Sequence, residues 1–471
     1  VNHRHFKANN PYLDDYDTTK PTSFIHYVDA NNLYGKSMSY KLPYKNFRWL
    51  DRDEIVLLDT SKIDPEGETC YILEVDLHYP AFLHDYHNDY PLAVESKMIE
   101  EHQLSPFNKK FLELHSEKFK ASRKLVPDLK DKKHFVCSLK TLQLCVNKGL
   151  EVEKIHRVLA ADQTDFVTPY IEFNSKKRQN AQSDFEKDFF KLANNSIYGK
   201  FIESLRNRTN VEIVKDQKSA KRLTSKPQFI GFHMLDDQTT VVQSVKRNLV
   251  LNKPIACGFI VLENAKNIMG EFWYDVLKPK YGNDIKLILS DTDSFIYGVF
   301  TRDGYEDLYR MRNLMDLSGY LNGTPLARFH DPANKKVPGK FSDEKPTEII
   351  SEVIALKPKM YSVVTKKLLF KCEKAHNCTS SCSIGHSVTA KGITKTAQRK
   401  IRHEDYRRVL STQCTTITKS QTIRTFGNKI YSVVVQKRGL SGFDDKKFIL
   451  DDGISTLSYG HKQLFKIDFL I

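Results

Sequence analysis

Apolar and polar positions change sharply within one stretch of the chain, Leu287 to Tyr297. Leu287-Ile288-Leu289 and Phe295-Ile296-Tyr297 are strand-like, whereas Ser290-Asp291-Thr292-Asp293-Ser294 between them is polar. This pattern predicts two short strands that meet at an acidic turn. An ordinary hairpin turn explains the same residues, because Asp and Ser are common in turns.

A second strand-like run, Phe24 to Val28, also ends in a carboxylate, that of Asp29. Strand alternation puts Tyr27 and Asp29 on one face and His26 on the other, as a packed residue. Leu33, Ser37 and Met38 then have the spacing of a short helix, which ends before Pro43.

Two longer helices are predicted. Ser183-x-x-Glu186 is a capping-box signal, and the helix after it extends to Tyr198-Gly199 with Phe185, Phe189, Leu192 and Ser196 on one stripe. The apolar positions from Ile260 to Val276 indicate an amphipathic helix beneath a sheet.

The rest of the chain also has patterns that predict strands, helices and connections. We expect strands or extended runs at 71–77, 150–159, 349–364 and 430–436, a mostly helical charged segment at 95–135, a helix end at Lys148-Gly149, a surface connection at 318–346 and a basic helix at Thr396 to Leu410. In the 349–364 run, Lys359 and Tyr361 are two apart and are expected on one face.

The carboxylates suggest a chemistry. By strand alternation Asp291 and Asp293 should point the same way, and unpaired negative charge is costly to bury. A divalent metal is the natural partner for such a pair.

Three stretches together resemble a known family. They are Asp29-x-x-x-Leu33-Tyr34, Lys191-x-x-x-Asn195-Ser196-x-Tyr198-Gly199 and Asp291-Thr292-Asp293-Ser294, with Lys359-Met360-Tyr361 as a fourth element. In this order they resemble the motifs of family B DNA polymerases. The likeness is to the protein-primed branch found in phages, adenoviruses, linear plasmids and Maverick/Polinton transposons, and it covers the chain from about residue 24 to the C-terminus.

The resemblance implies a mixed α/β fold, an α+β palm within a right-handed polymerase fold with fingers and thumb, and no N-terminal exonuclease domain. We assign 1–23 as a connecting segment, 24–171 as the first part of the palm with an insertion, 172–204 as fingers, 205–250 as a second insertion, 251–364 as the second part of the palm, and 365–471 as thumb and C-terminal region. The chain begins with Val1, so we expect a piece of a longer product, with any exonuclease upstream.

The resemblance also implies roles for individual residues. Asp29, Asp291 and Asp293 are the expected catalytic and metal-binding residues, for two Mg²⁺ ions that Mn²⁺ can replace. The expected nucleotide-binding residues are Tyr34, Arg178, Lys187, Lys191, Asn195 and Tyr198, with Tyr34 as a steric gate beneath the sugar. The alternatives are a core tyrosine for Tyr34 and a solvated helix face for the others. Lys359 and Tyr361 are expected to contact the template-primer.

Charge favours a polyanionic partner. The formal net charge is +15, and the segment Lys391 to Arg438 alone holds twelve Lys or Arg against Glu404 and Asp405. We expect this segment to track phosphates, with Arg399, Arg402 and Arg407 on the basic helix as DNA-binding residues. A merely soluble face is the alternative.

The eight cysteines lack the spacing of a secreted disulfide framework. Cys372, His376, Cys378, Cys382 and His386 offer enough ligands for zinc, but their spacing fits no standard finger, so a polar hairpin insertion is the stronger hypothesis. With no signal peptide and no membrane-length apolar run, we expect an intracellular protein, in the nucleus if a host-genome element encodes it.

The sequence thus predicts a template-directed DNA polymerase that replicates a viral or transposon genome. Its expected partners are template-primer DNA, deoxynucleoside triphosphates and a terminal priming protein. The alternative is an inactive, transposon-derived nucleic-acid-binding protein. A reverse transcriptase fits less well, because its second acidic motif usually pairs adjacent aspartates and it lacks the Lys-x-x-x-Asn-Ser-x-Tyr-Gly helix.

Overall fold

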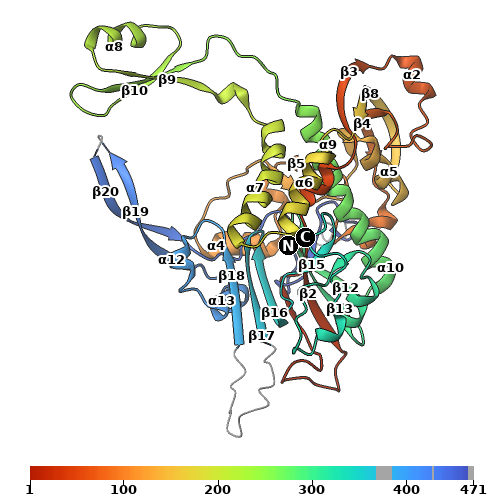
Figure 1. Ribbon diagram of the computed structural model, residues 1–471. Coiled ribbons are helices and arrows are strands. Elements are labelled where there is room, and N and C mark those ends of the chain that lie inside the picture. Colours follow the sequence, from red (N-terminus) through yellow and green to blue (C-terminus); the bar gives the residue numbers. More distant parts are fainter. Residues whose placement is uncertain (368–383, 427–428, 465–471) are drawn as a thin grey trace.

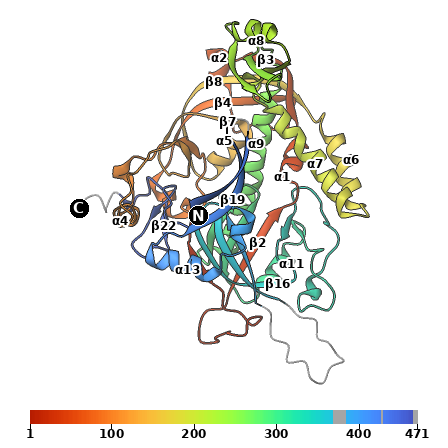
Figure 2. The same ribbon diagram turned by 90° about the vertical axis from the view of Figure 1, so that its left-hand side faces the viewer.

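The computed structural model describes residues 1–367, 384–426 and 429–464, and Figures 1 and 2 show their arrangement. A five-stranded sheet lies at the centre, in the order β12 (Ile285–Asp291), β13 (Ser294–Phe300), β2 (Ser23–Ala30), β15 (Phe341–Asp343) and β14 (Met315–Asp316). Its pairs are antiparallel except β14 with β15. The predicted hairpin and the strand before Asp29 are therefore confirmed.

A second sheet continues the structure beside the first, in the order β1 (His5–Lys7), β16 (Glu348–Lys357), β17 (Met360–Lys367) and β18 (Ile384–Ala390). The prediction of one extended run at 349–364 is wrong, because the chain reverses between β16 and β17. Lys359 lies in that turn with a φ of 60°, so alternation does not place it with Tyr361.

A third sheet has the order β3 (Leu42–Trp49), β8 (Glu151–Thr164), β4 (Thr69–His78) and β7 (Lys132–Ser138). This confirms the strands expected at 71–77 and 150–159. The mostly helical reading of 95–135 is wrong: the segment contains α4 (Pro106–Leu114), β5 (Glu95–Lys97), β6 (Lys124–Val126) and the start of β7. The charged residues of 95–135 suggested a helix, but the last residues of this segment, in β7, are extended because they pair with β4.

The helices pack against these sheets. α1 (Leu33–Met38) follows β2, and α6 (Thr168–Gln179) and α7 (Asp184–Phe201) lie side by side. α5 (Leu139–Asn147) ends just before Lys148 and Gly149, as predicted. The Ser183 side chain accepts the Glu186 N–H at the start of α7, as the capping signal predicted. The core helix is confirmed as α9 (Ile255–Glu271), which continues into the π-helix η4 (Phe272–Leu277).

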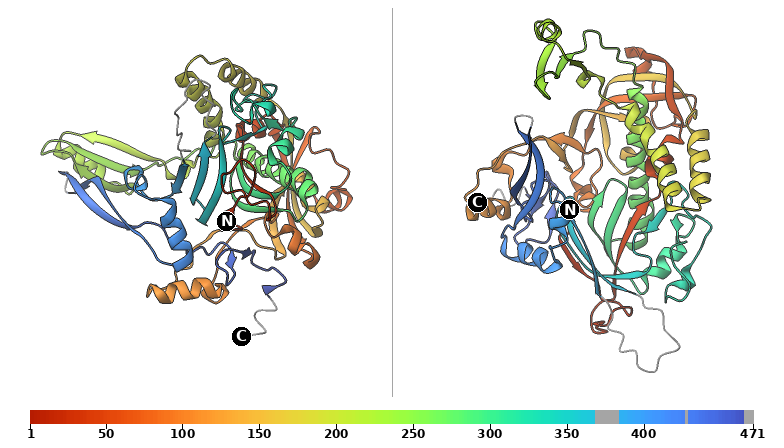
Figure 3. Two further views of the ribbon diagram at one scale, coloured as in Figure 1. Left: turned by 90° about the horizontal axis from the view of Figure 1, so that it is seen from below. Right: turned by 60° about the vertical axis from the view of Figure 1, so that its left-hand side comes forward.

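Two elements project from the same side of the body in Figure 1 and in the left view of Figure 3. One is a small sheet of β10 (Phe229–Met234), β11 (Thr240–Val245) and β9 (Thr209–Val214) with α8 (Gln217–Thr224). The other is the hairpin of β19 (Ile417–Phe426) and β20 (Lys429–Arg438), which contains the strand expected at 430–436.

The basic helix predicted from Thr396 to Leu410 is not continuous. It is divided into α12 (Lys395–Gln398) and α13 (His403–Thr412). Arg402 between them is extended, with a φ of −110° and a ψ of 165°, and the Asp405 carboxylate accepts its N–H. The helical periodicity holds in both α12 and α13, but α12 ends at Gln398 and Arg402 caps the start of α13.

The remaining elements are short. They are α2 (Arg52–Leu57), η1 (Ala81–Leu83), α3 (His84–His87), η2 (Glu101–Gln103), η3 (Leu205–Asn207), α10 (Lys278–Tyr281), α11 (Gly304–Arg310), η5 (Ala327–Phe329), β21 (Phe448–Ile449) and β22 (Thr456–Leu457). Within the expected surface connection at 318–346 lie η5 and β15, with β14 just before it, and the rest of that segment is irregular.

One large core holds the central sheet in place. Phe295 and Tyr297 of β13 and Trp273 of η4 are fully buried in it, and each such side chain contributes about 1.5–3 kcal/mol by leaving water. His26 is 2% exposed, so it is a packed strand residue as predicted. Among the described residues, no helix has both the length and the apolarity to cross a membrane.

Candidate active site

The acidic residues gather where three strands of the central sheet end. β13 lies between β12 and β2, and its first residue, Ser294, pairs with both Asp291 and Asp29. Directly paired residues project to the same face of a sheet. Asp29 and Asp291 therefore stand on one face, on either side of Ser294.

Asp293 reaches this place by a different route. It lies in the two-residue turn after Asp291, where Thr292 has a φ of 59° and the Asp293 N–H donates to the Asp291 carbonyl at 2.7 Å. A β-branched residue with positive φ is an outlier that the surroundings must stabilise. The Asp293 carbonyl accepts the N–H of Ala30 at 2.8 Å, which fixes the turn against β2. Strand alternation does not govern Asp293, so that argument for its direction was wrong.

The electrostatics show that the carboxylates crowd one another. Burial, followed by the charges of Asp293 and Glu344, raises the pKa of Asp29 to about 7. Burial and the charge of Asp291 raise the pKa of Asp293. Each shift means that the folded protein disfavours the ionised form of these groups. A cation at this place would relieve the repulsion.

Glu344 is a fourth carboxylate of this face that the sequence did not reveal. Ser342, two positions before Glu344, pairs with Asp29, and the Glu344 N–H donates to the Tyr27 carbonyl at 2.9 Å. Glu344 is exposed, on the same face as Tyr27 and Asp29. Only the pairing of β15 with β2, between segments far apart in the chain, could have shown this.

Lys359 also reaches the carboxylates. Its ammonium donates to both carboxylate oxygens of Asp291, each at 2.7 Å. Tyr361 points to the same region from β17, with its hydroxyl 3.1 Å from that of Tyr27. The two residues of this motif therefore reach the acidic face from a turn and from a strand.

The helix α7 presents Lys191 and Tyr198 to the site. The charge of Lys191 lowers the pKa of both Asp29 and Asp293, in opposition to burial. The ring of Tyr198 stacks on that of Tyr34, with 4.5 Å between centroids and 19° between planes. Burial, Tyr198 and Asp293 together raise the pKa of Tyr34, so Tyr34 lies between the helix and the acidic turn.

The other expected nucleotide-binding residues lie on the same helices without contacting the carboxylates. Lys187 pairs with Asp184 of its own helix at 3.0 Å. Burial lowers the pKa of Arg178 on α6, and the charge of Asp188 opposes this shift. Asn195 is exposed, whereas Asn194 is buried and its amide donates to the Ser175 hydroxyl at 3.3 Å.

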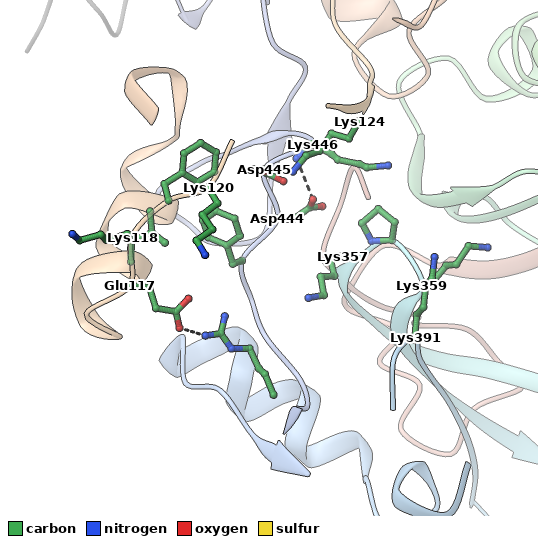
Figure 4. A pocket seen from close by; sticks show the side chains of 15 residues that line it. Glu117, Lys118, Lys120, Lys124, Lys357, Lys359, Lys391, Asp444, Asp445 and Lys446 are labelled. Carbon is green, nitrogen blue, oxygen red and sulfur yellow. Dashed lines mark hydrogen bonds and ion pairs between the residues drawn. The ribbon is translucent and has the colours of Figure 1, made fainter. Parts of the chain in front are cut away.

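A basic cavity of about 550 Å³ lies beside Lys359 (Figure 4). It is lined by Lys118, Lys120, Lys124, Lys357, Lys359, Lys391, Arg438 and Lys446, with Glu117, Asp444 and Asp445 as its acids. Arg438 pairs with Glu117 and Lys124 with Asp445. Burial lowers the pKa of Lys357. The cavity therefore keeps an excess of positive charge next to the acidic face.

The three arginines expected on the basic helix lie in different settings. Arg399 and Arg402 are exposed at the break between α12 and α13, and Arg402 is 3.4 Å from His386 Nε2. Arg407 lies on α13 and donates to the Glu352 carboxylate at 2.7 Å. Arg407 is thus already bound within the protein.

Metal-ligand types occur at one further place among the described residues. Atoms of His78, Asp131 and Glu153 lie within 4.8 Å of one another. However, Glu153 pairs with Lys133, and Asp131 accepts the Tyr79 N–H at 2.8 Å and contacts His78 at 2.9 Å. These contacts explain the cluster without a metal. Of the candidate zinc ligands, Cys372, His376, Cys378 and Cys382 lie outside the described residues.

Comparison with known proteins adds evidence on the fold. No protein-family model and no curated protein matches the sequence. Phi29 DNA polymerase in an orthorhombic crystal form matches with a TM-score of 0.50 and 12% identity, over 93% of this chain and 61% of that chain. Phi29 DNA polymerase complexed with primer-template DNA matches with a TM-score of 0.49 and 14% identity, over 92% and 60%.

The chain spans about three fifths of the length of the Phi29 DNA polymerase chains that it matches. Identities this low carry information on the fold and not on the activity. The predicted mixed α/β polymerase fold is confirmed: the chain has a fold similar to that of Phi29 DNA polymerase.

Proposed function

We propose that the chain is a template-directed DNA polymerase that adds deoxynucleotides to a primer 3′-hydroxyl by two-metal nucleotidyl transfer. One observation carries the proposal: Asp29 and Asp291 flank Ser294 on one sheet face, beside Asp293. The charge of Lys191 on α7 lowers the pKa of both Asp29 and Asp293. The similarity of the fold to that of Phi29 DNA polymerase supports the same reading.

The residues present fit two divalent cations. Their ligands are carboxylate oxygens, which Mg²⁺ prefers, and the raised pKa of Asp29 reflects negative charge that a cation would neutralise. Asp29 and Asp293 would hold the ions, with Asp291 in support, and Mn²⁺ could replace Mg²⁺. When bound, such ions stabilise the attacking and leaving oxygens of the displacement.

The nucleotide would lie between the palm and α7. Lys191, with Lys187 and Arg178 nearby on α7 and α6, would balance the negative charge of the triphosphate. Tyr34, held against Tyr198, would lie beneath the sugar and exclude a 2′-hydroxyl. Asn195 would complete the nucleotide face of the helix, and base pairing with the template would choose the nucleotide.

The primer and duplex would continue from Lys359 and Tyr361 into the basic cavity. Its lysines are suited to phosphates, which dominate protein affinity for DNA. Arg399 and Arg402 are exposed farther along the same basic region and would bind phosphates. Arg407 would act on DNA binding only indirectly, because it is bound to Glu352. The sequence resemblance to the protein-primed branch supports a role in the replication of a viral or transposon genome, and a terminal protein would serve as primer.

Primer extension tests the proposal. The purified chain, Mg²⁺ and a labelled primer are offered one deoxynucleotide at a time on DNA templates that differ in the next base. We expect addition of the complementary nucleotide alone, and none when the metal is chelated.

An RNA template separates the alternatives. Equal extension on RNA and DNA would indicate a reverse transcriptase. Salt-sensitive DNA binding without extension on either template would indicate an inactive binding protein and would overturn the proposal.

A further inference from the structure

A loop of the palm is fixed beside the first catalytic strand by a buried carboxylate. Asp316, 4% exposed, accepts two hydrogen bonds at one oxygen, Oδ2. One comes from the Asn31 side-chain amide at 2.8 Å and the other from the backbone N–H of Lys336 at 2.8 Å. Asn31 follows Asp29 by two positions, so this carboxylate holds Lys336 next to the end of β2.

Backbone contacts hold the same loop from its other end. The Gly339 N–H donates to the Asn31 carbonyl at 2.7 Å, and the Asn31 N–H donates to the Lys340 carbonyl at 2.8 Å. Gly339 has a φ of 81°, and a Cβ there would lie 2.7 Å from Cγ of Lys36. The loop therefore crosses Asn31 at close range and in one register.

Lys336 itself is exposed and has a φ of 56°. Positive φ in a residue other than glycine is uncommon and tends to occur at functional sites. The Lys336 ammonium is near enough to Asp29 for its charge to lower the pKa of that carboxyl, as the charge of Lys191 also does. In addition, the Gln179 amide of α6 donates to the Lys335 carbonyl at 3.2 Å, so the loop contacts one of the helices that would bind the nucleotide.

We propose that Lys336 is a triphosphate-binding residue that holds the β- and γ-phosphates of the incoming nucleotide, and then the pyrophosphate, from the palm side. This inference rests on the proposed function. In that reaction the primer oxygen bonds to the α-phosphorus and the bond to the bridging oxygen breaks. Its electron pair leaves with pyrophosphate, and the hydroxyl proton passes to solvent. Lys336 supplies a fixed positive charge where negative charge collects.

The test compares Lys336→Ala with Lys335→Ala, which removes the adjacent exposed lysine of the same loop and keeps the carbonyl that Gln179 contacts. Each is measured with primer-template DNA and Mg²⁺. We expect Lys336→Ala to raise the KM for the deoxynucleotide and the inhibition constant of pyrophosphate about tenfold or more, the loss of one charge-assisted contact. Lys336→Arg should recover most of the loss, and Lys335→Ala should match the wild type.

Two results would overturn the inference. One is a KM and a pyrophosphate inhibition constant unchanged in Lys336→Ala while the wild type extends primers, which would leave the proposed function standing. If the wild type does not extend, the proposed function fails, and calorimetric titration of Mg²⁺–pyrophosphate onto the DNA-bound protein decides the inference. Equal affinity of wild type and Lys336→Ala would then overturn it, and weaker binding by the variant would uphold Lys336 as a pyrophosphate-binding residue.

Discussion

Tyr34 lies where two different surroundings meet, the ring of Tyr198 on α7 and the acidic β12–β13 turn. The stack with Tyr198 is close and nearly parallel, at 4.5 Å and 19°, and such aromatic pairs contribute about 0.5–1.5 kcal/mol beyond their buried area. The ring is thereby held in one orientation. A fixed ring is what a steric gate requires, because a mobile one would yield to a 2′-hydroxyl.

Sugar discrimination should therefore depend on the ring of Tyr34 and not on its hydroxyl. We expect Tyr34→Val to incorporate ribonucleotides more readily by about tenfold or more, whereas Tyr34→Phe, which keeps the ring, should discriminate like the wild type. Competition between a ribonucleotide and the matching deoxynucleotide measures the ratio. An unchanged ratio in Tyr34→Val would return Tyr34 to the role of a core residue.

At this scale the sequence revealed the carboxylates but not their neighbours. Asp29, Asp291 and Asp293 stood out because they follow apolar, strand-like runs and belong to the motifs Asp-x-x-x-Leu-Tyr and Asp-Thr-Asp-Ser. Glu344 did not, because its place beside Asp29 depends on the pairing of β15 with β2. Lys359 was predicted on a strand because Pro358 is the only turn signal between Lys357 and Lys359. Its ion pair with Asp291 is a tertiary contact, which the sequence does not show.

The element α13 is joined to the sheet of β16 and β17 through Glu352. This carboxylate, 10% exposed, contacts His5 at 2.8 Å, His403 at 3.4 Å and Arg407 at 2.7 Å. Although burial opposes it, the nearby His403, His5 and Arg407 hold the pKa of Glu352 well below its ordinary value of 4.5. The carboxylate thus fastens the N-terminal strand, the sheet and the helix together.

The stabilisation by Glu352 should depend on pH in a defined direction. Because its pKa is lower in the folded protein than the unfolded value near 4.5, the stabilisation is complete above that pH and is lost as the pH falls toward the folded value. We expect Glu352→Gln to lower the apparent free energy of unfolding by about 3 kcal/mol at pH 7, as for other broken buried pairs.

Urea denaturation at pH 7 and at pH 3.5 measures this dependence. The difference between wild type and Glu352→Gln should be smaller at the lower pH, and Glu404→Gln, an exposed carboxylate of the same helix, should show little difference at either. A difference that grows as the pH falls would contradict the assignment.

Elements were predicted well wherever the apolar period was strong. β2, the β12–β13 hairpin, α7 and α9 all have a clear apolar pattern, and α7 also has a capping signal at its start. The single helix expected at 396–410 was wrong because Ile401 keeps the apolar spacing across the break and is itself buried. Periodicity alone cannot show that Arg402 is extended and that Asp405 caps a new helix.

For the whole molecule, the basic charge is arranged around the acidic face. The cavity beside Lys359 and the exposed Arg399 and Arg402 belong to segments that are distant in the chain. The sequence indicated the charge excess of the C-terminal third but not the cavity, because Lys118, Lys120 and Lys124 come from another part of the chain. Such an arrangement follows from tertiary packing only.

DNA affinity should therefore depend on salt through these cations. Each phosphate contact that is lost should reduce the slope of log affinity against log salt by about 0.9, so Arg399→Gln with Arg402→Gln should flatten it by about two. Arg407 is left intact, because its bond to Glu352 would mix stability with binding. Fluorescence anisotropy over a salt series measures the slope.

The matched control is Lys62→Gln, which removes an exposed lysine paired with Asp59 at 2.8 Å near α2. Its slope should equal that of the wild type. If the double arginine variant also keeps the wild-type slope, the break between α12 and α13 faces water and the DNA path lies elsewhere.

The central claim is that the carboxylates around Ser294 carry out metal-dependent nucleotide addition, and single-nucleotide primer extension by Asp29→Asn and Asp293→Asn tests it most directly. Each variant keeps the shape of the side chain and removes a negative charge that the crowded site disfavours, so both should fold and bind DNA like the wild type. We expect extension in Mg²⁺ to fall below detection in both variants, while DNA affinity and its salt slope stay unchanged. Normal extension by either variant would contradict it.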